Sequence, residues 1–272
     1  MCGFAALDFK KQLRVAATHP NPISRILDPH MPHTLFISDL HLSTTHPRSS
    51  ELFLHFVQHV APQAETLYIL GDLFEYWAGD DDLDDPFHRT ITASLHELSE
   101  RGTAIYLMHG NRDFLMAEKL AHACHATLLA DPTLLDLYGT PTLVSHGDAL
   151  CTDDYDYQAF RSQVRSTGWQ QQFLALPLSQ RKAQIEQLRR QSEEEKSHKQ
   201  MSIMDVNAES VCALLREHAY PRLIHGHTHR PARHLHHLDG HTCERWVLGD
   251  WDTKANALRC DNSGIRWEAI PD

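Results

Sequence analysis

Short apolar segments recur along the chain, and each is too short to form a helix on its own. They lie at residues 34–37, 67–70, 105–108, 143–144 and 223–224. We expect each of them to be a buried strand. Between the first three, residues 50–60 and 87–101 carry apolar side chains at helical spacing. Strands that alternate with helices predict an α/β fold, a layered sandwich in which helices flank β-sheets. Near the end of the chain, residues 246–250 are expected to complete a sheet, and no chemistry is expected in residues 232–272.

A cluster of polar residues follows each of the five predicted strands. The clusters are Asp39-Leu40-His41, Gly71-Asp72, Gly110-Asn111-Arg112-Asp113, His146-Gly147-Asp148 and Gly226-His227-Thr228-His229. Ligands of α/β sheets bind beyond the carboxyl ends of strands, so these clusters are expected to converge on one site. In Asp-x-His and His-x-His, the two ligands would point to the same side of an extended segment, because strand side chains alternate with a period of two.

A single Asp or His after a strand is usually a turn or cap residue. Five such clusters in this order indicate instead a metal site. Carboxylate, imidazole and amide donors together suit Mn²⁺, Fe or Zn²⁺ better than Ca²⁺. Glycine beside these donors lets the backbone approach the ions closely.

The composition narrows the classes of function. The 272 residues, 42% of them hydrophobic, can bury the core of one enzyme-sized domain. A net charge of -11 argues against a nucleic-acid binder, because such proteins use Lys and Arg to neutralise phosphates. The chain has no apolar run of roughly 18 residues and no apolar signal segment, so we expect a cytoplasmic protein. Nothing in the sequence indicates an obligate protein partner.

Histidine and cysteine are the two residue types with possible metal or redox chemistry. The 22 histidines suit metal ligation and proton transfer near neutral pH. Four of them, His234, His236, His237 and His241, lie in a polar run that is expected to be a solvated loop. The six cysteines contain no Cys-x-x-Cys pair and are expected to be free thiols.

Two segments stand apart from the alternating pattern. Residues 1–30 are aperiodic and are expected to be an extension of unknown role, with the main domain at residues 31–272. Residues 155–200 are polar and helix-permissive, and we expect them to form a helical lid inserted over the site. They carry eight Lys or Arg and four Glu, together with apolar residues such as Trp169 and Phe173. Such a segment could meet an anionic lipid surface, or it could be an ordinary surface helical hairpin.

The ordered clusters resemble the calcineurin-like metallophosphoesterase superfamily, whose sequence blocks run D-x-H, G-D, G-N, H-G and G-H-x-H. The resemblance covers residues 34 to about 252. It implies one metal held by Asp39, His41 and His229, a second held by Asn111, His146 and His227, and Asp72 bridging the two. Two metals can lower the pKa of a bridging water and neutralise phosphoryl oxygens, so hydrolysis is the implied reaction.

One residue departs from the pattern of many superfamily phosphatases. They have a His after the metal-ligating Asn, which is taken to protonate an alkoxide leaving group, whereas this chain has Arg112. Arg is not an acid near neutral pH, but its guanidinium can stabilise phosphate charge. A leaving group that is itself a phosphate, with a second pKa of about 6, needs no proton at departure. Arg112 therefore favours cleavage of a pyrophosphate over a phosphomonoester.

Longer runs resemble a narrower family, the UDP-2,3-diacylglucosamine diphosphatases of lipid A biosynthesis. Among these runs are Leu70-Gly71-Asp72-Leu73-Phe74-Glu75-Tyr76-Trp77, His109-Gly110-Asn111-Arg112-Asp113-Phe114 and His225-Gly226-His227-Thr228-His229-Arg230-Pro231. The resemblance implies attack at the α-phosphorus of the UDP-sugar, release of UMP and 2,3-diacylglucosamine 1-phosphate, and two Mn²⁺ ions per subunit. It also implies peripheral contact with the cytoplasmic face of the inner membrane.

The narrower resemblance also implies which residues contact the substrate. They are Asn111, Arg112, Asp154, Ser192, Lys196, Lys199 and His227. Of these, Asn111, Arg112 and His227 are expected to act at the reacting phosphate. Lys196 stands where the family can have Asn.

Three other functions remain open. The chain could be a pyrophosphatase or phosphodiesterase of a soluble nucleotide, although apolar residues such as Trp169 weigh against this. It could be a nuclease, which the acidic balance and the lack of a basic stripe outside the lid disfavour. It could also be a non-catalytic scaffold, which would have no need for seven metal ligands and Arg112.

Overall fold

The strands form two sheets. In the computed structural model, which describes residues 31–198, 205–252 and 255–270, one sheet has six strands in the order β11-β10-β1-β2-β3-β4 and the other has five in the order β5-β6-β7-β9-β8. The strands of the first sheet are β1 (Thr34–Ile37), β2 (Thr66–Leu70), β3 (Ala104–Met108), β4 (Thr127–Leu129), β10 (Asn256–Asp261) and β11 (Gly264–Ala269). The strands of the second are β5 (Thr133–Leu137), β6 (Thr140–Ser145), β7 (Arg222–His225), β8 (Ala232–Leu238) and β9 (His241–Val247).

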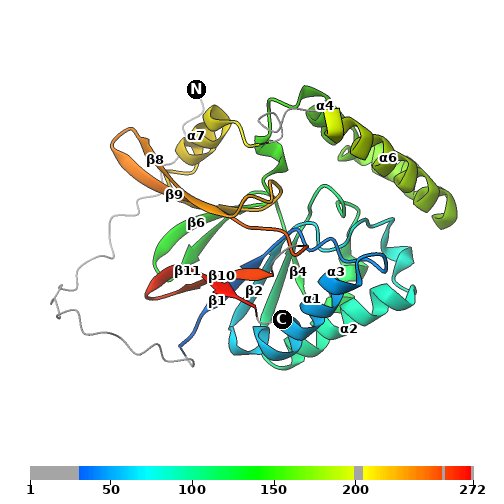
Figure 1. The fold of residues 1–272 in the computed structure, drawn as a ribbon, viewed down its shortest axis with the longest axis horizontal. Helices are drawn as coiled ribbons and strands as arrows, with labels where there is room; N and C mark the ends of the chain where they lie inside the picture. Colours follow the sequence, from blue (N-terminus) through cyan, green and yellow to red (C-terminus); the bar gives the residue numbers. More distant parts are fainter. Residues whose placement is uncertain (1–30, 199–204, 253–254, 271–272) are drawn as a thin grey trace, which may run out of the picture.

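Helices cover the outer face of each sheet, so the molecule has four layers (Figure 1). The covering helices are α1 (Pro47–His59), α2 (Pro86–Glu100) and α3 (Glu118–Cys124) on the first sheet and α7 (Ala208–Glu217) on the second. Short 3-10 helices are η1 (Ala61–Gln63), η2 (Asp80–Asp82) and η3 (Asp148–Leu150). The predicted α/β sandwich is confirmed.

The alternation of side chains along the buried strands explains the layers. On β1, Leu35 and Ile37 pack against the helices, whereas Phe36 points to the second sheet. On β6, Val144 faces the first sheet and Leu143 packs toward α7. Because each strand is apolar on both faces, it reads in the sequence as a continuous apolar run.

Helix α2 shows how the sequence sets an element's bounds. Its N-cap Asp85 accepts a hydrogen bond from the backbone N–H of Phe87, and Pro86 occupies the first turn. Ile91, Leu95 and Leu98 recur at helical spacing and are buried against the first sheet.

The histidine-rich segment is a hairpin, so the predicted loop was wrong, whereas His234, His237 and His241 are exposed to solvent as predicted. Strands β8 and β9 pair antiparallel around a two-residue turn, with Leu238 opposite His241. The turn residues Asp239 and Gly240 have φ of 51° and 83°, as a tight hairpin turn requires. Strand β8 lies at the sheet edge and is largely exposed, which is why its sequence is polar.

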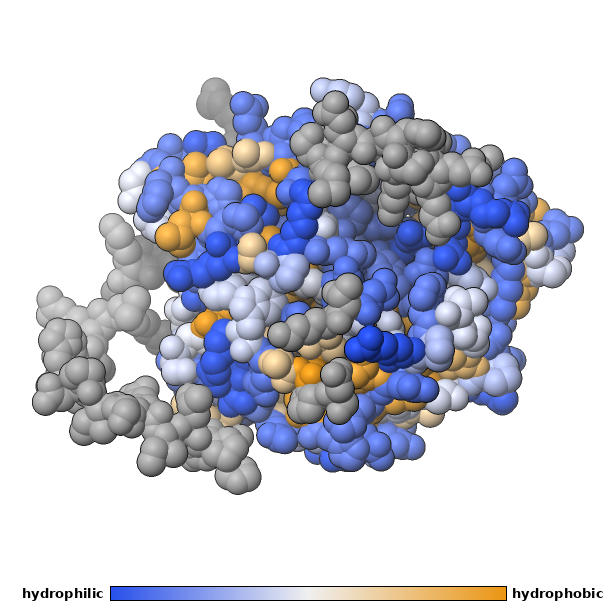
Figure 2. All heavy atoms as spheres, in the orientation of Figure 1, coloured by the Kyte–Doolittle hydropathy of each residue, from blue (hydrophilic) through white to orange (hydrophobic). Residues whose placement is uncertain are grey.

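Three helices occupy most of residues 155–200. They are α4 (Tyr155–Val164), α5 (Thr167–Leu174) and α6 (Leu178–His198), and α6 extends away from the sheets (Figure 1). We refer to α4, α5 and α6 together as the lid helices. No helix within the described ranges is long and apolar enough to cross a membrane. Hydrophilic residues predominate on the face shown in Figure 2. Residues 1–30, the predicted extension, lie outside the described residues.

Candidate metal centre and substrate cavity

The loops that follow β1, β2, β3, β6 and β7 meet at one end of the two sheets. Asn111 Oδ1 lies 3.0 Å from His146 Nε2 and 2.8 Å from His227 Nδ1. His41 Nε2 lies 3.3 Å from His229 Nε2. Asp39, which is fully buried, has a carboxylate oxygen 3.4 Å from His229 Nε2. The structure therefore brings together the side chains that the sequence singled out as metal ligands.

These side chains form two adjoining groups. One is Asp39, His41 and His229, and the other is Asp39, Asp72 and His146; in each group the potential ligand atoms lie within 4.8 Å of one another. Asn111 joins the second group through its bonds to His146 and His227. Two neighbouring sets of mixed oxygen and nitrogen donors suit a pair of transition-metal ions such as Mn²⁺.

The ligand loops are not extended, so the reason given for the Asp-x-His and His-x-His spacing was wrong. Strand β1 ends at Ile37 and β7 ends at His225, before the ligands begin. Five of the seven candidate ligands have positive φ. They are Asp39 (56°), His41 (49°), Asp72 (54°), His227 (68°) and His229 (54°). These left-handed residues curl each loop so that side chains two positions apart both turn inward, at a conformational cost of roughly 1–2 kcal/mol each.

Two glycines are required by the close approach of these loops. A Cβ on Gly110 would overlap the carboxylate and backbone N of Asp72, and one on Gly226 would overlap Ser38 and the carboxylate of Asp39. Glycine is needed at these two positions because the loops approach each other, whereas the predicted close approach of the backbone to ions stays a prediction.

Acceptor groups behind the histidines orient their rings. His146 Nδ1 lies 2.9 Å from the carbonyl oxygen of Leu70, which leaves Nε2 facing the cluster. His229 Nδ1 lies 3.1 Å from Asp250. His41 Nδ1 lies 3.3 Å from Glu75 but forms no hydrogen bond with any of the described residues. Such partners fix the tautomer of a metal-binding histidine and raise its basicity.

Sequence reasoning missed both Glu75 and Asp250. No chemistry was expected in residues 232–272, yet Asp250 of this segment contacts His229 of the candidate site. A signal for Asp250 was present, since it follows the end of β9 as the other site residues follow their strands. Glu75 had no comparable signal.

The buried carboxylates and histidines of the site shift one another's pKa values. Burial alone raises the pKa of Asp72, and neighbouring Asp113 and Asp39 add to this, so that it reaches about 7. Burial lowers the pKa of His146, but the carboxylates of Asp72, Asp148 and Asp39 outweigh it and raise the value to about 9. Protons are therefore held where carboxylates crowd together, and divalent cations at the same place would displace them.

The cluster forms one wall of a cavity of about 650 Å³. Of the predicted substrate contacts, Asn111, Arg112, Asp154 and His227 line it. Ser192 and Lys196 belong to helix α6, and Lys199 lies outside the described residues. The opposite wall comes from the lid helices and includes Trp169, Phe173, Ile185, Leu188 and Arg189.

Basic residues of the lid helices tie them to the sheets. Asp148, which is fully buried, accepts hydrogen bonds from Tyr157 Oη at 2.7 Å and Arg161 Nε at 2.8 Å, and lies 3.4 Å from Arg165 Nη2. Farther along, the buried Arg181 contacts Asp81. These arginines are thus paired with carboxylates of the sandwich.

A third group of acidic and histidine residues could hold a metal ion by its geometry, but a lysine side chain lies against it. Asp82, Asp85 and His88 have potential ligand atoms close together. Lys182 Nζ lies 2.6 Å from Asp82 and 3.7 Å from Asp85, so an ammonium group already supplies the positive charge there.

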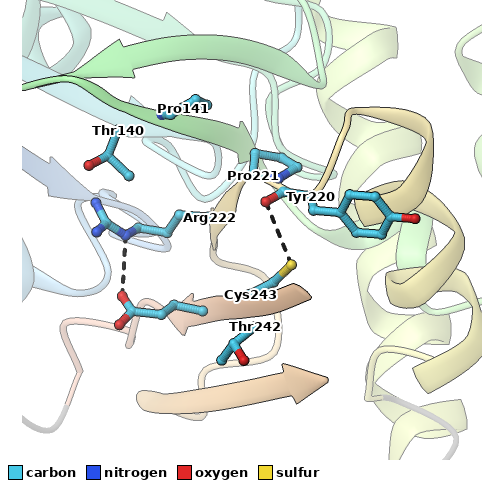
Figure 3. A pocket seen from close by; sticks show the side chains of 8 residues that line it. Thr140, Pro141, Tyr220, Pro221, Arg222, Thr242 and Cys243 are labelled. Carbon is cyan, nitrogen blue, oxygen red and sulfur yellow. Dashed lines mark hydrogen bonds and ion pairs between the residues drawn. The ribbon is translucent and has the colours of Figure 1, made fainter. Parts of the chain in front are cut away.

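A smaller pocket of about 290 Å³ lies at the opposite ends of the strands (Figure 3). Thr140 and Arg222, at the starts of β6 and β7, are among its lining residues. Arg222 pairs with Glu244 at 3.3 Å, and Cys243 Sγ lies 3.6 Å from the carbonyl oxygen of Tyr220. The charged groups of this pocket neutralise each other.

Two facing sheets, with histidine, aspartate and asparagine side chains gathered at the strand ends, are the architecture of a metal-dependent phosphoesterase. A family model described as calcineurin-like phosphoesterase matches residues 32–231, and the chain belongs to that family. Within it, the chain is 54% identical over 230 residues to a UDP-2,3-diacylglucosamine hydrolase of Aromatoleum aromaticum, covering 85% of this chain and 94% of the relative. It is 48% identical to proteins of the same name from Edwardsiella ictaluri (88% and 92% covered) and Cellvibrio japonicus (86% and 97%). The resemblance stated from the motifs is confirmed.

Proposed function

We propose that this chain hydrolyses the pyrophosphate bond of UDP-2,3-diacylglucosamine in lipid A biosynthesis, releasing UMP and 2,3-diacylglucosamine 1-phosphate. The observation that carries the proposal is one cavity with two different walls. One wall holds the candidate metal ligands and Arg112, which suit a diphosphate, and the other holds apolar lid side chains, which suit acyl chains. The names of the relatives that match nearly the whole chain point to the same reaction.

Two Mn²⁺ ions are the proposed cofactor. Asp39, His41 and His229 would hold one, Asn111, His146 and His227 the other, and Asp72 would bridge them. Such a pair lowers the pKa of a bound water and neutralises phosphoryl oxygens during in-line displacement. Asp250 and Glu75 would keep two of the histidine rings in orientation.

Arg112 is proposed to bind the phosphoryl oxygens of the substrate. Its backbone N–H donates to Asp72 at 2.8 Å, which fixes the residue beside the candidate metal centre, and its side chain lines the cavity. Asn111 and His227 share this wall. A guanidinium stabilises charge on the departing phosphate without transferring a proton, as expected for a pyrophosphate.

The apolar wall is proposed to bind the acyl chains and to exclude water. Trp169 stacks on Phe173 with ring centroids 4.7 Å apart, and Ile185 and Leu188 line the same side. On the lid helices Tyr155 is 79% exposed and Phe160 is 39% exposed. These exposed rings support a peripheral contact with the cytoplasmic face of the inner membrane, from which a lipid-linked substrate would enter. Asp154, Ser192, Lys196 and Lys199 remain proposed contacts to the substrate.

A comparison of three substrates tests the proposal. The protein is incubated with Mn²⁺ and UDP-2,3-diacylglucosamine, UDP-N-acetylglucosamine or p-nitrophenyl phosphate, with and without a chelator. UMP release from the acylated substrate alone, abolished by the chelator, is the expected result. Equal turnover of the unacylated sugar nucleotide would contradict the role of the apolar wall. Activity on the monoester alone would contradict the interpretation of Arg112, and chelator-insensitive activity would contradict the metal centre.

A further inference from the structure

Glu75 lies between two arginines, one from the loop that follows β3 and one from the lid helix α6. Its Oε1 is 2.6 Å from Arg189 Nη2 and 3.7 Å from Arg112 Nη1, and its Oε2 is 3.3 Å from His41 Nδ1. Only 7% of Glu75 is exposed. One carboxylate therefore faces two guanidinium groups, so Glu75 can neutralise only one of their two positive charges.

Arg189 differs from the arginines that tie the lid helices to the sheets. Unlike them, it lines the cavity, and its Nε is buried with no hydrogen-bond partner among the described residues. The guanidinium carbon lies 5.9 Å from the ring centre of Tyr76. A guanidinium has five N–H donors, so one contact to Glu75 leaves most of them for a ligand.

The neighbours of Arg189 on α6 indicate which phosphate it would meet. Ile185, one turn earlier, and Leu188, the preceding residue, line the same cavity. If the acyl chains lie against these side chains, the sugar that carries them lies beside Arg189. The phosphate attached to that sugar is then nearer to Arg189 than the phosphate of the uridine half.

We propose that Arg189 is a second substrate-binding guanidinium, specific for the phosphate on the acylated sugar, and that Glu75 holds it in place before the substrate enters. This inference rests on the proposed function, because it requires the acyl chains to occupy the apolar wall. Arg112 and Arg189 would then each bind one of the two phosphates of the diphosphate. The requirement for both would select a diphosphate over a substrate with one phosphate.

A pair of ligands that differ by one phosphate tests the inference. Binding of 2,3-diacylglucosamine 1-phosphate and of 2,3-diacylglucosamine is measured by calorimetry on the full chain with Mn²⁺, for wild type, Arg189→Gln, Arg189→Lys and the control Arg190→Gln. Arg190 is the adjacent residue, is largely exposed and pairs with Glu186 at 3.4 Å. Arg189→Gln is expected to weaken the binding of the phosphorylated ligand by about 10- to 100-fold and the binding of the other ligand by less than about twofold.

The variants and the two ligands separate the ways in which the inference could fail. Arg189→Lys keeps the charge but not the planar fork, so it is expected to lose only part of the affinity for the phosphorylated ligand. Equal weakening of both ligands by Arg189→Gln would mean that Arg189 only holds the lid helices, and would overturn the inference. An effect of Arg190→Gln equal to that of Arg189→Gln would overturn it as well. If wild type binds neither ligand, the acyl site itself is wrong, and the proposed function fails with the inference.

Discussion

Replacing Asp148 by Asn would break the tie between the sheets and the first lid helix while keeping the shape of the side chain. Asp148 is fully buried, and it is the shared acceptor of Tyr157, Arg161 and Arg165. Removing the charged partner of a buried ion pair costs about 3–5 kcal/mol. Arg161 and Arg165 keep 22% and 21% exposure, so water partly screens them. We therefore expect Asp148→Asn to lower the free energy of unfolding by about 2–4 kcal/mol.

The pH dependence provides an internal check on this value. Burial alone would raise the pKa of Asp148, but the charges of His146 and Arg165 and the hydrogen bond from Arg161 hold it below its ordinary value. A carboxyl group whose folded-state pKa is depressed stabilises the fold above its unfolded-state pKa of about 3.9, and this stability is lost as the pH falls through the folded-state pKa. The difference between wild type and Asp148→Asn should thus stay constant from about pH 7 to pH 5 and shrink below about pH 4.

Urea denaturation measures both effects. The matched control is Asp84→Asn, because Asp84 is exposed and its loss of charge should change the unfolding free energy by less than about 0.5 kcal/mol. If Asp148→Asn unfolds at the same urea concentration as Asp84→Asn, the ion-pair argument is refuted. A difference that persists unchanged to pH 3 would refute the assignment to the carboxylate charge.

Three further predictions concern the candidate active site. Gly110→Ala should lower the activity, and it should lower the unfolding free energy by about 1–3 kcal/mol, because the added Cβ overlaps Asp72. Gly168→Ala on α5, where no atom lies within 4 Å, should instead raise the unfolding free energy by up to about 1 kcal/mol. Thermal denaturation and turnover with Mn²⁺ compare the two variants. Asp250→Asn should weaken Mn²⁺ binding by about 10- to 100-fold, measured by calorimetry, and unchanged affinity would exclude a role for Asp250 in orienting His229. Arg112→His should gain p-nitrophenyl phosphate hydrolysis and lose pyrophosphate cleavage, and a variant that loses both without gaining the monoester would argue against the interpretation of Arg112.

The parts of the fold that the sequence predicted are those buried on both faces. Strands β1, β2 and β3 read as continuous apolar runs because helices cover one side and the second sheet covers the other. Strand β6 was recognised only at residues 143–144, since its first half, with Thr140 and Pro141, is less buried. Strand β8 was missed altogether because an exposed edge strand needs no apolar pattern.

In the candidate site, too, the residues placed by local sequence were predicted and the contacts between distant segments were not. The seven candidate ligands were found because each follows a strand within four positions, whereas Asp250, three positions after β9, was missed. The pairs Asp148–Arg161, Glu75–Arg189 and Asp250–His229 were not predicted, because each depends on how separate segments meet in space.

The position of β1 in the first sheet has a consequence for synthesis of the protein. Strand β1 lies between β2 and β10, and Thr34 pairs with Cys260 across almost the whole chain. During translation one edge of β1 therefore stays open until the last strands leave the ribosome. An open apolar edge is a template for pairing with other chains, so this interval is when aggregation is most favoured. Loss of β10 and β11 would make that exposure permanent, and with it would loosen the strand that carries Asp39 and His41 into the metal centre.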